Sequence, residues 1–388
     1  MRFVAIVVVL GCSPREPATP PPTTPVAAAL DAAAAMPGDA AVAVAPPIDA
    51  APPAPAIAPR IELTFAGDIM FGGTFSGRYV PQEAGTFDPL KDIAPQLASD
   101  LALINLETTV VSKIPVDQLI GDLRFAARPD QVATLVRNGV KAVTIANNHA
   151  ADVDGAGIRE TPGHLRDLGI TVFGAPRTEL PLVRIEPIEV RGWNIAIIAA
   201  TTRLNRSQAK TDPKVPLVQG EVLAKELVPL VKAARAKHDL VFVVLHWGVQ
   251  YADNPDQWQI DAAHAFIDAG ADAVIGHHPH ILQRFERYKD GLIAYSLGNF
   301  LFNNALPGQR NTGVLRLGFA NKGGKRCLDL VVLHPAAMFP SPVHHPKPVT
   351  GKLFDEIEAR VIKLSAKGTS PTKWRADGDK LVAPAACP

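Results

Sequence analysis

Several short apolar runs in this sequence each end in a polar residue of a kind that binds metal ions. Such runs are typical of buried strands, and in open α/β sheets ligands bind outside the carboxyl ends of the strands. Oxygen and imidazole groups gathered at one sheet edge suit a divalent transition metal, so the sequence predicts a metal site built from strand ends. The residues at these ends are Asp68, Glu107, Asn148, His149, His246, His278, His280 and Asn299.

The central part of the chain predicts an α/β fold. Apolar runs alternate with helix-like stretches, as in βαβ units around a largely parallel sheet. Gly139, Gly169 and Gly270 each follow a helix-like stretch, where a left-handed residue commonly ends a helix. Asn254 followed by Pro255 is a favourable helix start. Helices are predicted at 89–99, 130–138, 158–168, 222–237, 255–269 and 352–366.

The C-terminal part of the sequence has a different character. Short strands with few helices between them are expected there, and they predict a second, more antiparallel sheet. The proline-rich stretch 335–348 predicts a loop or arm ahead of an amphipathic helix. The predicted fold class is therefore α/β, with two packed mixed β-sheets flanked by helices. The four strands of the second sheet are expected at 283–288, 292–296, 313–319 and 328–333.

The N-terminus resembles a bacterial lipoprotein signal. Arg2 precedes an apolar run that is much shorter than the roughly 20 residues of a membrane-spanning helix, and the run ends in Gly11-Cys12. Cys12 is the predicted lipidation site, and Ser13 beside it is similar to outer-membrane sorting signals. The alternative is a wrongly assigned start codon or a chance cysteine. The expected location is the cell envelope, with a lipid anchor on the periplasmic side of the outer membrane.

Composition separates the rest of the chain into parts. Residues 13–60 consist largely of Pro, Ala, Thr and Val, which predicts a disordered tether with a polyproline-II bias. The predicted organisation is a signal peptide and lipobox at 1–12, the tether at 13–60, a globular domain at 61–334, and a C-terminal arm and helix at 335–388. The formal net charge is +1 and no basic stripe is present, so nucleic acid is not an expected partner.

The cysteines and the absent motifs narrow the chemistry further. Cys327 and Cys387 remain if Cys12 is lipidated, and in an oxidising compartment they either pair or stay as two free thiols. The sequence contains no Gly-x-Ser-x-Gly elbow, no phosphate-binding loop and no Cys-x-x-Cys pair. Nothing therefore competes with the metal-site interpretation.

The carboxylates and the asparagine–histidine pair suggest distinct roles. Asp68 follows Gly67, which allows a close backbone approach, although a turn aspartate is the simpler explanation for that pair taken alone. Glu107 ends a very apolar run, where an ionised carboxylate needs a cation. The carbonyl of Asn148 suits a metal, while His149 suits an acid or electrostatic donor to substrate. Asp152 is expected to orient His149 or to cap the next helix.

The remaining histidines are the strongest signal. His246 ends the most apolar run of the chain, and its place level with the other strand ends favours a ligand over a core residue. His277, His278 and His280 lie within one short segment made rigid by Pro279, for which packing offers no explanation. Metal ligation is therefore predicted for His246, His278 and His280.

In their order along the chain, these motifs resemble the CapA-type capsule-synthesis proteins, a family associated with poly-γ-glutamate capsule biosynthesis. That family is similar in fold to the calcineurin-like metallophosphoesterases. The resemblance runs from about Ile61 to Phe302, with weaker coverage to about His334. The motifs are Gly67-Asp68-Ile69-Met70, Asn105-Leu106-Glu107, Asn147-Asn148-His149, His246-Trp247-Gly248, Gly276-His277-His278-Pro279-His280 and Ser296-Leu297-Gly298-Asn299-Phe300.

The resemblance implies a ligand set for one or two divalent ions, which would be manganese, iron or zinc. Asp68 and His280 would hold one metal, and Glu107 would bridge to the second. The ligands completing the second site would be Asn148, His246 and His278. His149 would assist the leaving group, with Asp152 as its catalytic partner. Residues assigned to substrate binding are Asn105, His277 and Asn299.

Two positions depart from the expected pattern. Met70 stands where the wider phosphoesterase pattern has a histidine, which predicts a weaker first metal site. Gln250 stands where CapA-type proteins often carry a glutamate. The function expected from the resemblance is an envelope lipoprotein of capsule or poly-γ-glutamate-type polymer biosynthesis with a metallophosphoesterase-like site. Its expected partners are an anionic polymer or phosphoester substrate and a capsule-synthesis complex.

Two alternatives to a phosphoesterase remain open at this point. A non-catalytic accessory subunit would use the same pocket to bind an anionic polymer for export or anchoring, and the two departures at Met70 and Gln250 favour it slightly. A hydrolase or transferase acting on γ-glutamyl amide bonds is the other alternative, because the same metal chemistry polarises a carbonyl group.

Overall fold

The computed structural model describes residues 57–75, 78–81, 87–120, 123–303, 306–368, 370–385 and 387. The chain divides into two units, Met1–Pro52 and Pro53–Pro388, and every described residue belongs to the second. The predicted signal peptide, the lipidation site at Cys12 and nearly all of the tether lie outside the described residues. Within the described part of the chain, no helix has the length and apolar character needed to cross a membrane.

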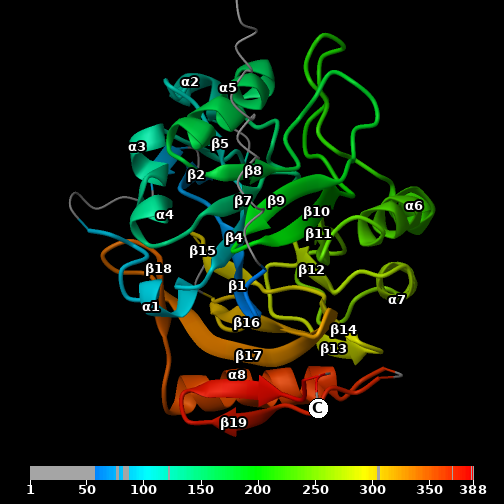
Figure 1. The fold of residues 1–388 in the computed structure, drawn as a ribbon. Helices are drawn as coiled ribbons and strands as arrows, with labels where there is room; N and C mark the ends of the chain where they lie inside the picture. The colour runs from blue at the N-terminus through cyan, green and yellow to red at the C-terminus, as the bar shows by residue number, and fades with distance from the viewer. Residues whose placement is uncertain are drawn as a thin grey trace, which may run out of the picture. The chain divides into compact units, whose positions relative to one another are not determined.

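The larger of two main sheets contains ten strands (Figure 1). Four of its strands run parallel in the order β1, β4, β7, β8, and the others extend the opposite side of β1, mostly in antiparallel pairing. The strands are β1 (Arg60–Ile69), β4 (Leu101–Leu106), β7 (Ala142–Thr144), β8 (Thr171–Phe173), β15 (Asn299–Leu301), β16 (Asn311–Lys322), β17 (Lys325–Phe339), β18 (His345–Pro348), β19 (Arg375–Asp377) and β20 (Lys380–Ala383).

The second main sheet has six strands in the order β13-β14-β12-β11-β10-β9. Its central strands are parallel, and both edge strands pair antiparallel to their neighbours. These strands are β9 (Glu186–Val190), β10 (Trp193–Thr201), β11 (Leu240–His246), β12 (Ala273–His277), β13 (Phe285–Tyr288) and β14 (Gly291–Ala294). Two small two-stranded sheets are formed by β2 (Gly72–Phe75) with β3 (Arg78–Pro81), and β5 (Thr109–Val110) with β6 (Ala126–Ala127).

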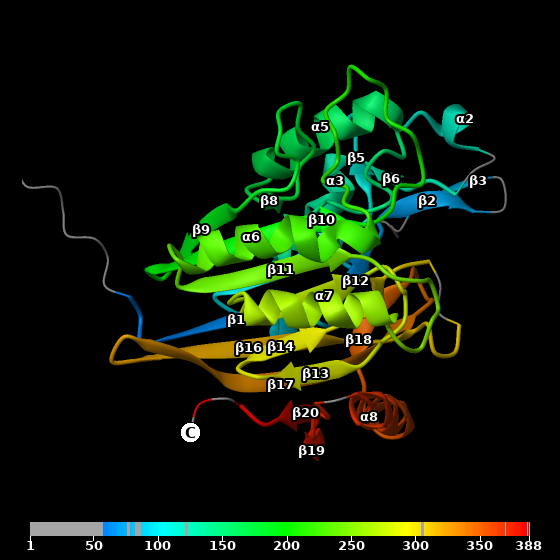
Figure 2. The same ribbon diagram turned by 90° about the vertical axis from the view of Figure 1, so that its right-hand side faces the viewer.

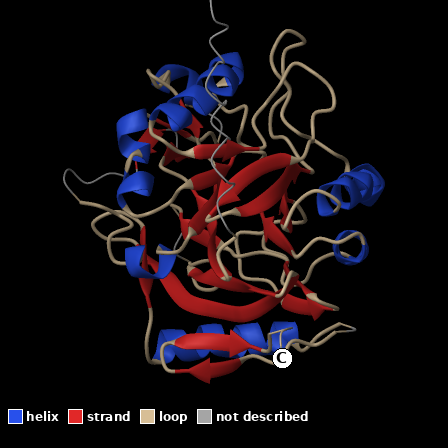
Figure 3. Cartoon of the chain, in the orientation of Figure 1, coloured by secondary structure: helices blue, strands red, loops and turns tan. Residues whose placement is uncertain are grey.

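Helices lie outside the two sheets (Figures 2 and 3). Two of them, α6 and α7, cover the outer face of the six-stranded sheet, and α8 packs beside β17. The helices are α1 (Ala94–Leu97), α2 (Val116–Leu119), α3 (Pro129–Val132), α4 (Thr134–Arg137), α5 (Asp154–Asp167), α6 (Leu223–Arg235), α7 (Gln257–Asp268) and α8 (Lys352–Ser365), with a 3₁₀ turn at Gly220–Val222.

The strand β11 shows why the sequence folds into two packed sheets. Phe242 and Val244 face the other sheet and join the central core, while Val241, Val243 and Leu245 face the covering helices. A strand buried on both faces needs an uninterrupted apolar run, which the sequence supplies. The predicted fold class, two packed mixed sheets flanked by helices, is confirmed.

The C-terminal strands do not form one separate sheet, contrary to prediction. β13 and β14 join β12 in the six-stranded sheet, whereas β16 and β17 join β1 in the ten-stranded sheet. Each main sheet is therefore mixed, because the antiparallel strands add to the edges of parallel sheets. The stretch 335–348, predicted as a loop or arm, is also largely strand: β17 continues to Phe339 and pairs with β18.

Local details correct three of the predicted helices. The helix expected at 89–99 is reduced to α1, and the one at 130–138 is divided into α3 and α4. The N-cap of α7 is Asp256, which forms a capping box with Gln259, so Asn254 and Pro255 lie outside the helix. The three glycines predicted to end helices do adopt positive φ angles, of 84° at Gly139, 79° at Gly169 and 111° at Gly270.

A disulfide joins Cys327 on β17 to Cys387, with their Cα atoms 5.5 Å apart. From the sequence alone these two cysteines could form a disulfide or stay as free thiols, and in the structure they are paired. The bond fastens the end of the chain to the larger sheet, and the backbone N–H of Cys387 also donates to the carbonyl of Leu328.

Candidate metal centre

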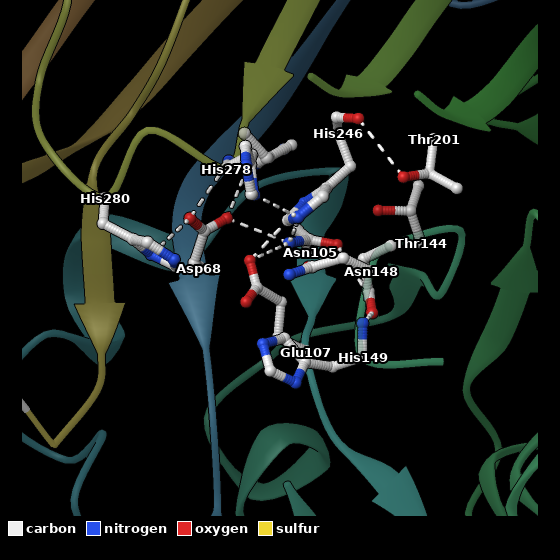
Figure 4. Close-up of polar contacts among 12 residues, drawn as sticks. Asp68, Asn105, Glu107, Thr144, Asn148, His149, Thr201, His246, His278 and His280 are labelled. Carbon is white, nitrogen blue, oxygen red and sulfur yellow. Dashed lines mark hydrogen bonds and ion pairs between the residues drawn. The ribbon is translucent and has the colours of Figure 1, made fainter. Parts of the chain in front are cut away.

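The two sheets place the carboxyl ends of four strands at one spot. Asp68 and Asn105 are neighbours on β1 and β4 of the larger sheet, and His246 and His277 are neighbours on β11 and β12 of the smaller one. Glu107 follows β4 directly, and all five side chains are buried. Figure 4 shows the carboxylates and His246 pointing toward one another. The predicted convergence of strand ends is thus present.

This convergence depends on two glycines where backbones meet. A Cβ atom at Gly67 would lie 2.0 Å from the carbonyl oxygen of Gly298, and one at Gly276 would lie 2.0 Å from that of Tyr295. Neither position can carry a side chain without moving a strand. Glycine therefore allows β1 and β12 to pack closely against the segment that leads into β15. This close packing brings Asp68 near the histidine loop, the segment after β12 that contains His278 and His280.

The two carboxylates are joined by one amide. Asn105 Nδ2 is 2.9 Å from Asp68 Oδ1 and 3.1 Å from Glu107 Oε1, and it is 3.3 Å from His246 Nδ1. Glu107 Oε1 is also 3.4 Å from His246 Nδ1. Asn105 therefore contacts predicted metal ligands directly and supports their positions. Its predicted role in substrate binding stays a prediction.

The histidine loop after β12 contacts Asp68 from the other side. The backbone N–H of His278 lies 3.3 Å from Asp68 Oδ2, and His280 Nδ1 lies 3.3 Å from the same oxygen. His278 Nδ1 is 3.0 Å from His246 Nε2, and His280 Nδ1 is 2.8 Å from Asn299 Oδ1. His278 and His280 have φ angles of 98° and 59°, unusual for residues with side chains and most often found at functional sites.

His277 is buried beside Asp68 without a settled partner. Its Nδ1 is 3.2 Å from Asp68 Oδ1 but is not aligned for a hydrogen bond, and neither ring nitrogen has a hydrogen-bond partner among the described residues. Its predicted part in substrate binding stays a prediction, as does that of Asn299, which the structure places against His280.

Burial and neighbouring charges shift the ionisation of these groups. For Asp68, burial favours the neutral acid, but the adjacent imidazoles of His277 and His280 outweigh it and hold the pKa well below its usual range. For Glu107, burial and the charge of Asp68 raise the pKa well above normal. Burial, helped by His278, lowers the pKa of His246 well below normal. Burial and the charge of His280 lower the pKa of His278 to about 3.

Atoms without hydrogen-bond partners test whether a metal ion fits here. Glu107 Oε2, Asn148 Oδ1 and His278 Nε2 are all buried, and none has a hydrogen-bond partner among the described residues. A buried polar atom without a partner lowers the stability of the fold unless another group, such as a metal ion, binds it. Each is a type of atom that ligates divalent transition metals. Ligand atoms of Asp68, Glu107 and His246 also lie within 4.8 Å of one another. The residues therefore fit a divalent cation.

His149 and Asp152 form a second buried unit beside the carboxylates. His149 Nδ1 is 2.6 Å from Asp152 Oδ2, and the backbone N–H of Phe125 donates to the same oxygen at 2.6 Å. The ring of Phe125 stacks on that of His149, with centroids 3.8 Å apart. Asp152 therefore orients His149, one of the two possibilities left open by the sequence, and α5 begins just after it, at Asp154.

Two asparagines to which the sequence analysis gave no role complete this unit. Asn147 Nδ2 donates to the carbonyl of Leu106 at 2.8 Å and lies 3.2 Å from Asn105 Oδ1. Asn205 Oδ1 accepts from Asn148 Nδ2 at 3.2 Å, and Asn205 Nδ2 lies 3.3 Å from His149 Nε2. Asn205 comes from the loop after β10, in which no apolar run or motif marks it.

The environment of Met70 is apolar. Met70 is fully buried and packs in one cluster with Phe125, Phe302 and Met338. The ring of Phe302 also lies 4.8 Å from that of His280. The side of the centre that holds Asp68 and His280 thus borders hydrocarbon at the position where the resemblance leads one to expect a histidine.

Exposed or half-exposed residues lie near the centre. Arg203 is exposed, and its positive charge contributes to the lowered pKa of His278. Tyr251 is half exposed, has a φ angle of 61°, and lies with its ring 6.0 Å from that of His280. Gln250 is exposed next to it. No role was assigned to Tyr251 from the sequence.

Comparison with known families identifies a match over most of the globular part. Residues 62–304 match the model described as "Bacterial capsule synthesis protein PGA_cap". This segment includes every predicted metal ligand.

Curated relatives with similar sequences carry related descriptions. The chain is 29% identical to "Capsule biosynthesis protein CapA" of Bacillus anthracis, over 83% of this chain and 77% of that protein. It is 27% identical to "PGA biosynthesis protein CapA" of Bacillus subtilis, over 83% and 81% respectively. A more partial match, 28% identical over 52% of this chain and 55% of the relative, is "Probable polyglutamine synthesis accessory protein Rv0574c" of Mycobacterium tuberculosis.

Solved structures give more distant matches. A hypothetical protein from Thermus thermophilus has a TM-score of 0.39 and 16% identity, covering 74% of this chain and 98% of that one. The calcineurin-like phosphoesterase YfkN from Bacillus subtilis has a TM-score of 0.38 and 14% identity, covering 78% of this chain and 97% of that one.

Proposed function

Because the chain belongs to the bacterial capsule synthesis protein family PGA_cap, we propose that it acts in capsule or poly-γ-glutamate-type polymer metabolism as a metal-dependent hydrolase. One observation carries the catalytic part of this proposal. Three buried metal-ligating atoms, on Glu107, Asn148 and His278, lack hydrogen-bond partners among the described residues and lie beside an oriented histidine. The family assignment made from the sequence motifs is confirmed by the family match.

The residues proposed to hold metal are those that the strand ends bring together. Glu107, Asn148, His246 and His278 would hold the tighter ion, and Asp68 with His280 the weaker one. The donor set of carboxylate, amide and imidazole groups suits manganese, iron or zinc. When bound, such an ion supplies Lewis-acid polarisation of the bond to be cleaved and orients the substrate.

His149 is proposed as the group that assists the leaving group. Asp152 Oδ2 accepts a hydrogen bond from Nδ1 and so fixes the ring, and Nε2 lies 3.3 Å from Asn205 Nδ2. Phe125 covers one face of the ring and keeps water from that side. A positioned histidine of this kind contributes roughly 10²–10⁴-fold to a rate by proton transfer.

An anionic substrate is supported by an arginine near the centre. Arg203 is exposed and close enough to act electrostatically on His278. A guanidinium in that place suits a phosphate ester or the carboxylates of a polyglutamate chain. The proposed partners are such a polymer or phosphoester and a capsule-synthesis complex, with no nucleic acid.

The accessory-subunit alternative rests on one observation. The Asp68–His280 side borders the apolar cluster of Met70, so a two-metal arrangement lacks a ligand there. If the second ion does not bind, the pocket still holds an anionic polymer through a single metal and Arg203. This alternative predicts metal binding and polymer binding without turnover.

Attachment to the cell envelope is proposed from the N-terminal motif. Val9-Leu10-Gly11-Cys12 would direct lipidation at Cys12, and residues 13–60 would hold the domain away from the membrane. The disulfide between Cys327 and Cys387 supports an oxidising compartment such as the periplasm. Cys12→Ser is expected to release the protein from the membrane fraction; unchanged membrane association would argue for a different attachment.

The decisive experiment combines metal analysis with a substrate screen. Purified protein is loaded with manganese or zinc and assayed on a chromogenic phosphodiester and on a γ-glutamyl anilide, beside the His149→Ala variant. Turnover that requires both metal and His149 supports the hydrolase, and the substrate that is cleaved decides between phosphoester and γ-glutamyl amide chemistry. Metal and polyglutamate binding without turnover of either substrate would favour the accessory subunit.

A further inference from the structure

Asn205, in the loop between β10 and α6, contacts both a proposed metal ligand and the proposed acid–base histidine. It comes from the exposed loop that follows β10 in the smaller sheet, whereas Asn148 and His149 follow β7 in the larger one. The backbone N–H of Asn205 donates to the carbonyl of Asn148 at 3.1 Å, which holds the two loops in register. A residue of this loop thus reaches the centre from the opposite sheet.

The side-chain amide of Asn205 joins His149 to Asn148 through hydrogen bonds at both of its ends. His149 Nδ1 donates a hydrogen bond to the carboxylate of Asp152, and in the tautomer with its single proton on Nδ1 the ring presents a lone pair at Nε2. The group of Asn205 that faces Nε2 at 3.3 Å must then be its NH₂. Its carbonyl oxygen therefore faces Asn148, and only an NH₂ can donate to it, at 3.2 Å.

This arrangement determines which atom of Asn148 reaches the metal centre. With Nδ2 bound to Asn205, Asn148 Oδ1 is left buried and without a hydrogen-bond partner among the described residues. An amide NH₂ does not ligate a cation, whereas a carbonyl oxygen does. We infer that Asn205 is a positioning residue, which holds the Asn148 amide with its oxygen toward the metal. This inference rests on the proposed metal centre.

The test measures metal affinity rather than activity. Manganese is titrated by calorimetry into the full-length protein and its variants, with thermal melting as the check on folding. Asn205→Ala frees the amide of Asn148 to rotate, and its manganese affinity is expected to fall roughly 10-fold or more, as loss of a supporting partner does at other metal sites. Asn205→Asp keeps the acceptor for Asn148 Nδ2, so its affinity is expected not to fall. Ser207→Ala, an exposed change in the same loop, is the matched control.

A double-mutant cycle separates positioning from general damage to the loop. In Asn148→Asp both terminal atoms are oxygens, so rotation no longer removes the ligand. Asn205→Ala is therefore expected to cost little affinity in that background, although it costs roughly 10-fold in the wild type. An equal loss in both backgrounds, or no loss in the wild type, would overturn the inference while leaving the metal centre intact. A wild-type protein that binds neither manganese nor zinc overturns the proposed function, and this inference with it.

Discussion

The two sides of the metal centre differ in how far the protein satisfies its own ligand atoms. On the side of Glu107, Asn148 and His278, three ligating atoms are buried and lack hydrogen-bond partners among the described residues. On the side of Asp68 and His280, both oxygens of Asp68 accept hydrogen bonds from the protein, and His280 Nδ1 is bonded to Asn299. We therefore expect the first side to bind a cation more tightly than the second.

The residues that surround the two sides of the centre also differ. Asn205 donates and accepts hydrogen bonds on the Glu107 side, where it contacts Asn148, whereas Asn105 bonds both Glu107 and Asp68. The Asp68 side borders the apolar cluster around Met70. The two sides therefore differ in how far the protein's own contacts satisfy the atoms that we propose as metal ligands.

The most severe test of this comparison is His246→Ala. His246 lies between Glu107 and His278, so its loss removes a ligand from the side that has the full set. Bound metal is expected to fall by more than the roughly 10–100-fold that removal of a mere supporting residue costs. Metal content after dialysis and a manganese titration measure the effect. Affinity equal to that of the wild type would show that the ligands are wrongly assigned.

His149→Ala tests whether the well-supported side also carries the chemistry. The ring contacts Asp152, Phe125 and Asn205 rather than Asp68 or Glu107, so metal binding is expected to persist. Turnover of a substrate that the wild type cleaves should fall roughly 10²–10⁴-fold. His164→Ala on α5, where the imidazole bonds Ser112 and Glu160 at the surface, is the matched control. Full activity in His149→Ala would remove this residue from the mechanism.

Asp68→Ala sharpens the comparison from the weaker side. Its loss removes a carboxylate that the protein already satisfies, so the tighter ion is expected to remain and only the second to be lost. The measurement is stoichiometry by calorimetry and by elemental analysis, compared directly with His246→Ala. If Asp68→Ala empties the whole centre, the two sides form a single site and the distinction between them fails.

A change far from the centre should leave both sides untouched. Cys327→Ser breaks the disulfide that closes a sequence separation of 60 residues, and it is expected to lower the free energy of unfolding by roughly 2–4 kcal/mol. Metal affinity should stay at the wild-type value, because the bond lies on β17 and the C-terminal tail. Chemical denaturation and manganese titration on the same sample check both statements. A changed affinity would mean that the tail influences the centre.

The sequence determined much of this protein by itself. Continuous apolar runs such as β11 specify strands that are buried on both faces. The polar residues that follow these runs specify which side chains lie at the ends of the strands. The same motifs also identify the family, because family membership is recognised from the order of these residues along the chain. These signals are local, so a single sequence records them.

Other features depended on contacts between distant segments. The four C-terminal strands divide between two sheets, because pairing of β16 with β1 and of β14 with β12 is a choice of partner that no local pattern encodes. The partnership of Asn205 with Asn148 and His149 joins loops from opposite sheets, and nothing in the loop sequence distinguishes Asn205 from a surface asparagine. Likewise, the apolar cluster around Met70 forms only when Phe125, Phe302 and Met338 are brought together in space. Strand propensity and ligand chemistry are properties of residues, whereas the choice of partners and the satisfaction of hydrogen bonds are properties of the packed molecule.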